Sequence, residues 1–118
     1  MEDQMAKQFR EGIYRAEFNT LTMEGIGLVV LRDGRVYGGD TLIYYVGTYS
    51  VSGNRVTARV KAFPYKGMPI EGVETVLGRG KNALDMEGEI DGDDILLGGR
   101  SKEASGTGIK IKLQFLHE

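Results

Sequence analysis

Segment 33–40 holds the residue types that could bind a phosphate or a metal ion. It reads D-G-R-V-Y-G-G-D, with glycine amides for an anion and two carboxylates for a cation. An Asp-Gly pair, however, also accepts the positive φ angles of a tight type I′ hairpin turn. The Gly-Gly pair would then bend a strand or form a bulge, and the second aspartate would cap the bend. We therefore predict that this segment reverses the chain. The turn-forming residues are Asp33, Gly34, Gly38, Gly39 and Asp40.

Two later segments raise the same question. The acidic run at 85–94 resembles the start of a calcium loop, but Gly98 occupies the twelfth position, where a bidentate glutamate is needed. The segment G-R-S-K-E-A-S-G-T-G at 99–108 lacks the G-x-x-x-x-G-K-[ST] order of a phosphate loop. The sequence predicts a solvated strand face for the first and a loop for the second, and it predicts no metal site and no cofactor.

Catalysis is poorly supported by the residues present. His117 is the single histidine and stands one residue from the C-terminal end of the sequence, where a base is seldom held rigidly. There is no cysteine to act as a nucleophile or to form a thiolate zinc site. The sequence therefore predicts no catalytic residues, and we expect a protein that is not an enzyme.

The composition is that of a globular protein with unusually many turns. The 118 residues are 41% hydrophobic and 27% charged. Of these residues 18 are glycine, which is about twice the usual share of about 7%. A net charge of −2 gives no reason to expect binding to nucleic acid or to an anionic membrane. Without cysteines, an apolar leader or a long apolar run, we expect a cytoplasmic protein.

The elements that must position these residues are strands. In 54–63 the apolar Val56, Ala58, Val60 and Ala62 alternate with charged or polar residues, which is typical of a half-buried antiparallel strand. Similar patterns predict eight or nine short strands, so a closed barrel or a sandwich is expected. Residues 1–11 would be a tail or a short helical turn before one β domain at 12–118. The other predicted strands are 13–19, 25–32, 35–38, 42–51, 72–78, 84–91, 95–100 and 109–115.

The order G-L-V-V-L-R-D-G-R-V-Y-G-G-D, followed by Y-Y-V-G-T-Y at 44–49, resembles the GrlR-like family of negative regulators of type III secretion. The opening G-I-Y-R-A-E-F at 12–18 is also similar to the start of that family's barrel, so the resemblance covers mainly residues 12–65. It implies an all-β fold, a closed antiparallel up-and-down barrel of about eight strands with a lipocalin-like form. The positions that match are Gly12, Tyr14, Gly34, Gly38, Gly39, Asp40 and Gly47.

The same resemblance implies a function by binding. The family would imply a homodimer that sequesters a transcriptional activator, and an apolar cavity with a plug-like loop. The acidic motif that the family uses for its activator is replaced here by V-S-G-N at 51–54, so that contact does not carry over. We expect a homodimeric regulator that acts by protein contact. The alternative is a carrier or sensor of a small lipid-like molecule.

Aromatic side chains are the candidates for lining such a cavity. Tyr45 and Tyr49 share one face of their strand and Tyr44 shares the other with Val46; one set would fill or line the barrel. The segment P-Y-K-G-M-P at 64–69 is the candidate lid, because proline cannot donate within a sheet. The predicted cavity residues are Tyr14, Phe18, Tyr45, Tyr49, Val56 and Val60.

The strand at 25–31, G-I-G-L-V-V-L, lacks the charged alternation of the others. Only one face can point into a barrel, so the other would expose apolar side chains unless a partner covers them. The pattern does not decide between the faces, but the small Gly25 and Gly27 suit a crowded interior. We therefore predict a dimer interface formed by Ile26, Leu28 and Val30.

Overall fold

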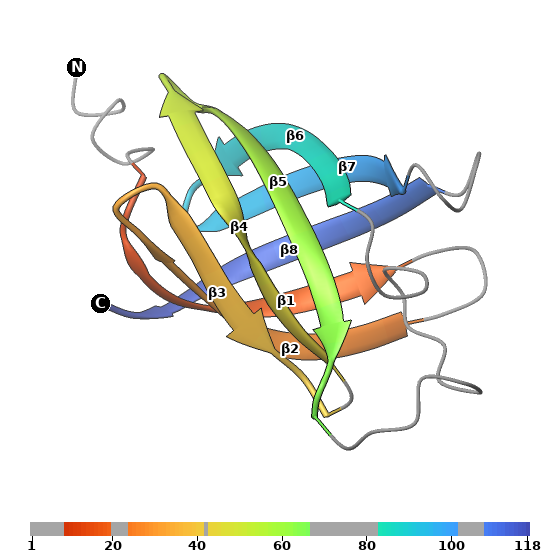
Figure 1. Ribbon diagram of the computed structural model, residues 1–118. Coiled ribbons are helices and arrows are strands. Elements are labelled where there is room, and N and C mark those ends of the chain that lie inside the picture. Colours follow the sequence, from red (N-terminus) through yellow and green to blue (C-terminus); the bar gives the residue numbers. More distant parts are fainter. Residues whose placement is uncertain (1–8, 20–23, 42, 67–82, 102–107) are drawn as a thin grey trace.

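The computed structural model is a closed eight-stranded antiparallel β-barrel (Figure 1). It describes residues 9–19, 24–41, 43–66, 83–101 and 108–118, so the predicted strand at 72–78 lies outside the described residues. The strands are β1 (Gly12–Asn19), β2 (Glu24–Arg32), β3 (Arg35–Gly39), β4 (Ile43–Ser52), β5 (Arg55–Pro64), β6 (Ala83–Asp91), β7 (Asp94–Ser101) and β8 (Gly108–His117).

The topology decides between a barrel and a sandwich. Each strand pairs antiparallel with the next one along the chain, and β1 also pairs with β8, which closes the sheet. The predicted up-and-down barrel is therefore confirmed, because a sandwich would leave two separate sheets. Within the described ranges, no helix has the length and apolar character needed to cross a membrane.

Alternating side chains build the core as the sequence predicts. On β5, Val56 and Val60 are 1% and 7% exposed and point into the barrel with Ala62, while Arg55 and Arg59 lie outside. The outer arginines pair with acids of the neighbouring strand β6, Arg55 with Glu87 at 2.6 Å and Arg59 with Asp85 at 3.3 Å. One face of the strand thus contributes side chains to the core. The other face forms exposed ion pairs, which contribute little to the free energy of folding.

Three two-residue hairpins lie at or next to turn signals of the sequence, the pairs Asp33-Gly34, Gly53-Asn54 and Asp91-Gly92. Asp33 and Gly34 have φ angles of 53° and 77°, as a type I′ turn between β2 and β3 requires. Gly53 and Asn54 join β4 to β5. The turn from β6 to β7 is one residue later than predicted, at Gly92 and Asp93, because Asp91 pairs with Asp94. A fourth turn signal of the sequence, the pair Gly80-Lys81, lies outside the described residues.

Gly38 and Gly39 correct the prediction of a bulge or turn. Both lie in β3, and the register with β2 and with β4 runs through them without a shift. A Cβ atom on Gly38 would stand only 2.2 Å from the carbonyl oxygen of Leu28, and one on Gly39 only 2.6 Å from the hydroxyl of Tyr65. Gly38 is therefore needed for the close approach of the β2 backbone, whereas the atom nearest to Gly39 belongs to the end of a side chain.

We expect Gly38→Ala to lower the free energy of unfolding by about 1–3 kcal/mol, because the new methyl group would push β3 away from β2. Gly98→Ala is the matched control, since its Cβ atom would lie 3.9 Å from the nearest atom, the oxygen of Ile109. That variant should stay within about 0.5 kcal/mol of the wild type. Urea denaturation measures both, and equal losses would contradict the close approach.

Candidate functional site

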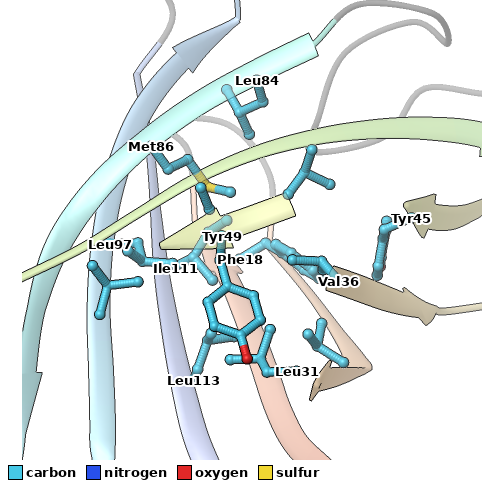
Figure 2. Close-up of a pocket in the computed structure, with 14 residues that line it drawn as sticks. Phe18, Leu31, Val36, Tyr45, Tyr49, Leu84, Met86, Leu97, Ile111 and Leu113 are labelled. Carbon is cyan, nitrogen blue, oxygen red and sulfur yellow. The ribbon is translucent and has the colours of Figure 1, made fainter. Parts of the chain in front are cut away.

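The barrel encloses a cavity of about 40 Å³ whose walls are side chains from all parts of the sheet (Figure 2). Five of the six predicted cavity residues line it, namely Phe18, Tyr45, Tyr49, Val56 and Val60. The other lining residues are aliphatic side chains and one methionine that the alternation places on inward positions: Val29, Leu31, Val36, Ala58, Leu84, Met86, Leu97, Ile111 and Leu113.

Tyr14 is the predicted cavity residue that the structure places elsewhere. It is buried inside the barrel but does not line the cavity. Its hydroxyl donates a 2.5 Å hydrogen bond to the carbonyl oxygen of Arg10, and its ring meets Phe115 edge-on at 5.4 Å. The inward direction was readable from alternation, but the depth along the barrel axis was not.

The cavity volume decides what the interior can hold as it stands. An engineered protein cavity of about 150 Å³ binds benzene, and one water needs about 10–15 Å³. The 40 Å³ cavity is therefore too small for a benzene ring or an acyl chain in this conformation. Side chains, with Phe18 and Tyr45 packed edge-on at 5.4 Å, fill most of the interior.

The chain preceding β1 covers one end of the barrel. The ring of Phe9 packs against Tyr49 with centroids 5.2 Å apart. The guanidinium of Arg10 lies 3.7 Å from the centre of the Phe115 ring and forms a 2.8 Å ion pair with Asp93. Residues 1–8 lie outside the described residues. Aromatic and charged contacts thus hold residues 9–10 over the interior.

Asp40 organises the opposite end. Its Oδ1 accepts a hydrogen bond from the amide of Ile43 at 3.0 Å, so it caps the β3–β4 connection and not the bend predicted at Gly38 and Gly39. Its Oδ2 accepts from the buried Tyr45 hydroxyl at 2.5 Å, and its carbonyl oxygen accepts from Tyr65 at 2.6 Å. One aspartate therefore ties the β3–β4 connection to the interior and to the chain that follows β5.

The candidate lid at 64–69 is only partly described. Pro64 is the last residue of β5, opposite Ile43, so the expectation that it stays outside the sheet is wrong. A proline is tolerated at such a strand end, where its missing N–H interrupts no continuing ladder. Tyr65 and Lys66 follow the strand, and residues 67–69 lie outside the described residues.

Burial raises the pKa of Tyr14 to about 12, and we expect this shift to make the barrel sensitive to alkali. In the unfolded chain tyrosine loses its proton near pH 10. Between about pH 10 and about pH 12 the unfolded state binds fewer protons, so the free energy of unfolding falls as the pH rises. Tyr14→Phe should lose less stability over this range, by up to about 1.4 kcal/mol per pH unit. Urea denaturation across the range measures this, and parallel pH profiles would contradict it.

The outer face of β2 is the second candidate site. Ile26 and Leu28 are 59% and 53% exposed, and Val30 beside them is half-buried. The predicted orientation is confirmed, since Gly27, Val29 and Leu31 are the buried set. A Cβ atom on Gly27 would stand 2.8 Å from the carbonyl oxygen of Gly39 and 2.9 Å from the Tyr45 hydroxyl, which is why this inward position holds glycine.

The apolar outer surface continues from β2 onto the neighbouring strands, and sequence reasoning missed this continuation. Ile13, Val30, Tyr37 and Val46 are successive cross-strand neighbours on β1 to β4. The register that brings them into one row is decided by strand pairing and cannot be read from any single strand. A shallow groove beside them lies between β2 and the β3–β4 connection, lined among others by Ile26, Leu28 and Thr41.

An aromatic group extends the same side of the barrel. Tyr44 lies 5.5 Å from Phe63 and 5.9 Å from Tyr65 between ring centroids. Tyr44 points outward while Tyr45 points inward, as the alternation predicts. The outer faces of β5 and β6 instead carry the ion-paired side chains described above. An apolar outer surface therefore lies between the charged ends of β2 and continues to Tyr44 of β4.

The histidine and the acidic residues considered for catalysis or metal binding lie in separate parts of the barrel. His117 is exposed, and its Nδ1 lies 2.7 Å from the carbonyl oxygen of Glu118. Asp85 and Glu87 of the acidic run point outward toward arginines of β5. Among the residues that the structure describes, no three acids or histidines gather closely enough to hold a metal ion. These side chains form no shared site.

The barrel thus offers a small apolar cavity and an exposed apolar outer face. Comparison of the chain with models of protein families and with curated proteins finds no match.

Proposed function

We propose that this protein is a non-enzymatic homodimer that acts by binding, with the outer face of β2 as its dimer interface. The observation that carries the proposal is the pair Ile26 and Leu28, exposed side by side on the same face. Single exposed apolar residues are ordinary, but neighbouring ones mark interaction surfaces. The chain contains no cysteine, which suits work in a reducing cytoplasm.

The energetics favour covering this face. Full burial of an aliphatic side chain contributes about 1.5–3 kcal/mol, and roughly half of the surface of Ile26 and of Leu28 remains exposed. Each of them would therefore contribute about 1 kcal/mol when a second subunit covers it. A two-fold dimer covers each of these residues in both subunits, so each contribution is made twice. Val30 and Tyr37 lie next to them and would enlarge the contact.

The regulatory role rests on the resemblance to the GrlR-like family. The acidic activator-binding motif is absent at 51–54, where Ser52 and Gly53 enter the β4–β5 turn. A protein partner, such as a transcriptional activator, would need another surface. The aromatic group of Tyr44, Phe63 and Tyr65 is the surface that we propose for it, since aromatic residues are enriched in interface cores.

The alternative function, a carrier or sensor of a lipid-like molecule, has the apolar lining in its favour. The cavity volume of about 40 Å³ weighs against it, because an acyl chain would have to displace several packed side chains. Native mass spectrometry of the purified protein and titration with a fluorescent fatty acid test this alternative. A bound lipid in either would restore it.

Light scattering on the full chain tests the main proposal. We expect a mass of twice 13.0 kDa, falling toward 13.0 kDa on dilution. The physical reason is the exposed aliphatic face, which a second copy can cover by two-fold symmetry. A single mass of 13.0 kDa at every concentration would contradict the homodimer and leave the outer face without its proposed role.

A further inference from the structure

We propose that the outer face of β2 is self-complementary and packs antiparallel on β2 of a second copy, with Glu24 against Arg32 of the partner subunit. The inference rests on the homodimer proposed above and adds its geometry and its charge pairs. It is carried by the order of charges along one strand face.

The outward positions of β2 have a two-ended pattern. They read Glu24, Ile26, Leu28, Val30 and Arg32, with an acid at one end, a base at the other and aliphatic side chains between them. Leu28 is the midpoint. At about 3.3 Å per residue, each charged end lies about 13 Å from it along the strand.

Both charged ends are available for a partner. Glu24 and Arg32 are exposed, and neither has an ion-pair partner among the described residues. Arg32 also stands directly opposite Arg35 of β3, which is exposed as well. Like charges in directly opposite positions destabilise a sheet, so an acid from a second subunit would stabilise this end.

The charge order selects one of the two ways in which β2 can stack on its own copy. If the two strands ran parallel, Glu24 would face Glu24 of the partner subunit, and the two Arg32 side chains would also meet. If they run antiparallel, each end meets its opposite, and the same pair forms twice. Sheet faces pack about 10 Å apart, a gap that an arginine and a glutamate can bridge together.

The neighbouring strands are compatible with this packing. Arg15 of β1 lies beside Leu28 at the midpoint, where it would approach its own copy, but it is already ion-paired with Glu17. Because a barrel surface curves, β1 and β3 fall away from the contact on both sides of β2. The aliphatic residues of β2 would form its centre, and Tyr37 of β3 its rim.

A charge exchange on the full chain tests the geometry. Glu24→Arg and Arg32→Glu each turn two attractive pairs into two repulsive ones, so each should raise the dimer dissociation constant about tenfold or more. The double variant restores opposite charges at both pairs and should return within about threefold of the wild type. Sedimentation velocity over a dilution series measures these constants, and high salt should shrink the differences.

Glu89→Arg is the control, since Glu89 is exposed on β6, four strands away from β2 around the barrel. It should leave the dissociation constant unchanged. A double variant as weak as the single ones would overturn the antiparallel pairing. If charge exchange has no effect while the wild type remains dimeric, the homodimer stands and this geometry is wrong. A monomeric wild type would refute both.

Discussion

Val60→Asp is expected to lower the free energy of unfolding by about 3–5 kcal/mol, a large part of the stability of a small domain. Val60 is 7% exposed and lines the apolar cavity, next to its cross-strand partner Leu84 and to Met86 on the neighbouring strand β6. The cavity offers no positive charge to pair with a carboxylate. The variant must therefore either bury an uncompensated charge or protonate it at a cost.

Lys61→Asp is the matched control, because it introduces the same side chain at the next position of β5. Lys61 points outward and is exposed. Its replacement should change the free energy of unfolding by no more than about 0.5 kcal/mol. Thermal or urea denaturation of both variants measures the difference. Similar losses in the two would mean that the inward and outward faces of β5 are assigned the wrong way round.

Leu28→Asp and Val29→Asp are expected to fail in different ways, although they are neighbours in the sequence. Leu28 is 53% exposed on the proposed dimer interface, so an aspartate there stays in solvent in the monomer but becomes unpaired in the dimer. We expect a folded monomer. Val29 is buried and lines the cavity, so its replacement should unfold the chain.

Circular dichroism reports the fold of the two variants, and light scattering reports their mass. The β-rich spectrum of the wild type should be retained by Leu28→Asp and lost by Val29→Asp. Two folded dimers would remove β2 from the interface. A folded monomer that appears only for Val29→Asp would reverse the orientation of the strand.

Local sequence patterns, independent of tertiary contacts, determine the strands, the direction of their side chains and the tight turns of this protein. The alternation from Val56 to Ala62 predicted which side chains of β5 face inward, because side chains of a strand point to opposite faces by turns. Asp33 and Gly34 predicted their hairpin, since few other pairs accept two positive φ angles. Repeated short strands with close turns predicted a β-barrel or a sandwich.

Only the tertiary structure decided the features that depend on how strands meet. The sequence predicts a bend or bulge at Gly38 and Gly39, but the carbonyl oxygen of Leu28 explains Gly38, and this distance depends on how β2 and β3 pair. The inward direction of Tyr14 predicts a place in the cavity. Its position along the barrel axis instead brings its hydroxyl within hydrogen-bond distance of the carbonyl oxygen of Arg10.

The candidate sites divide in the same way. The sequence showed that the strand at 25–31 has two apolar faces, but it could not show which face closure of the barrel would bury. Gly27 lies against Gly39 and Tyr45, so Ile26 and Leu28 face outward. Cavity volume is a difference between the space a barrel encloses and the side chains that fill it. That difference, about 40 Å³ here, exists only once all eight strands are closed around it.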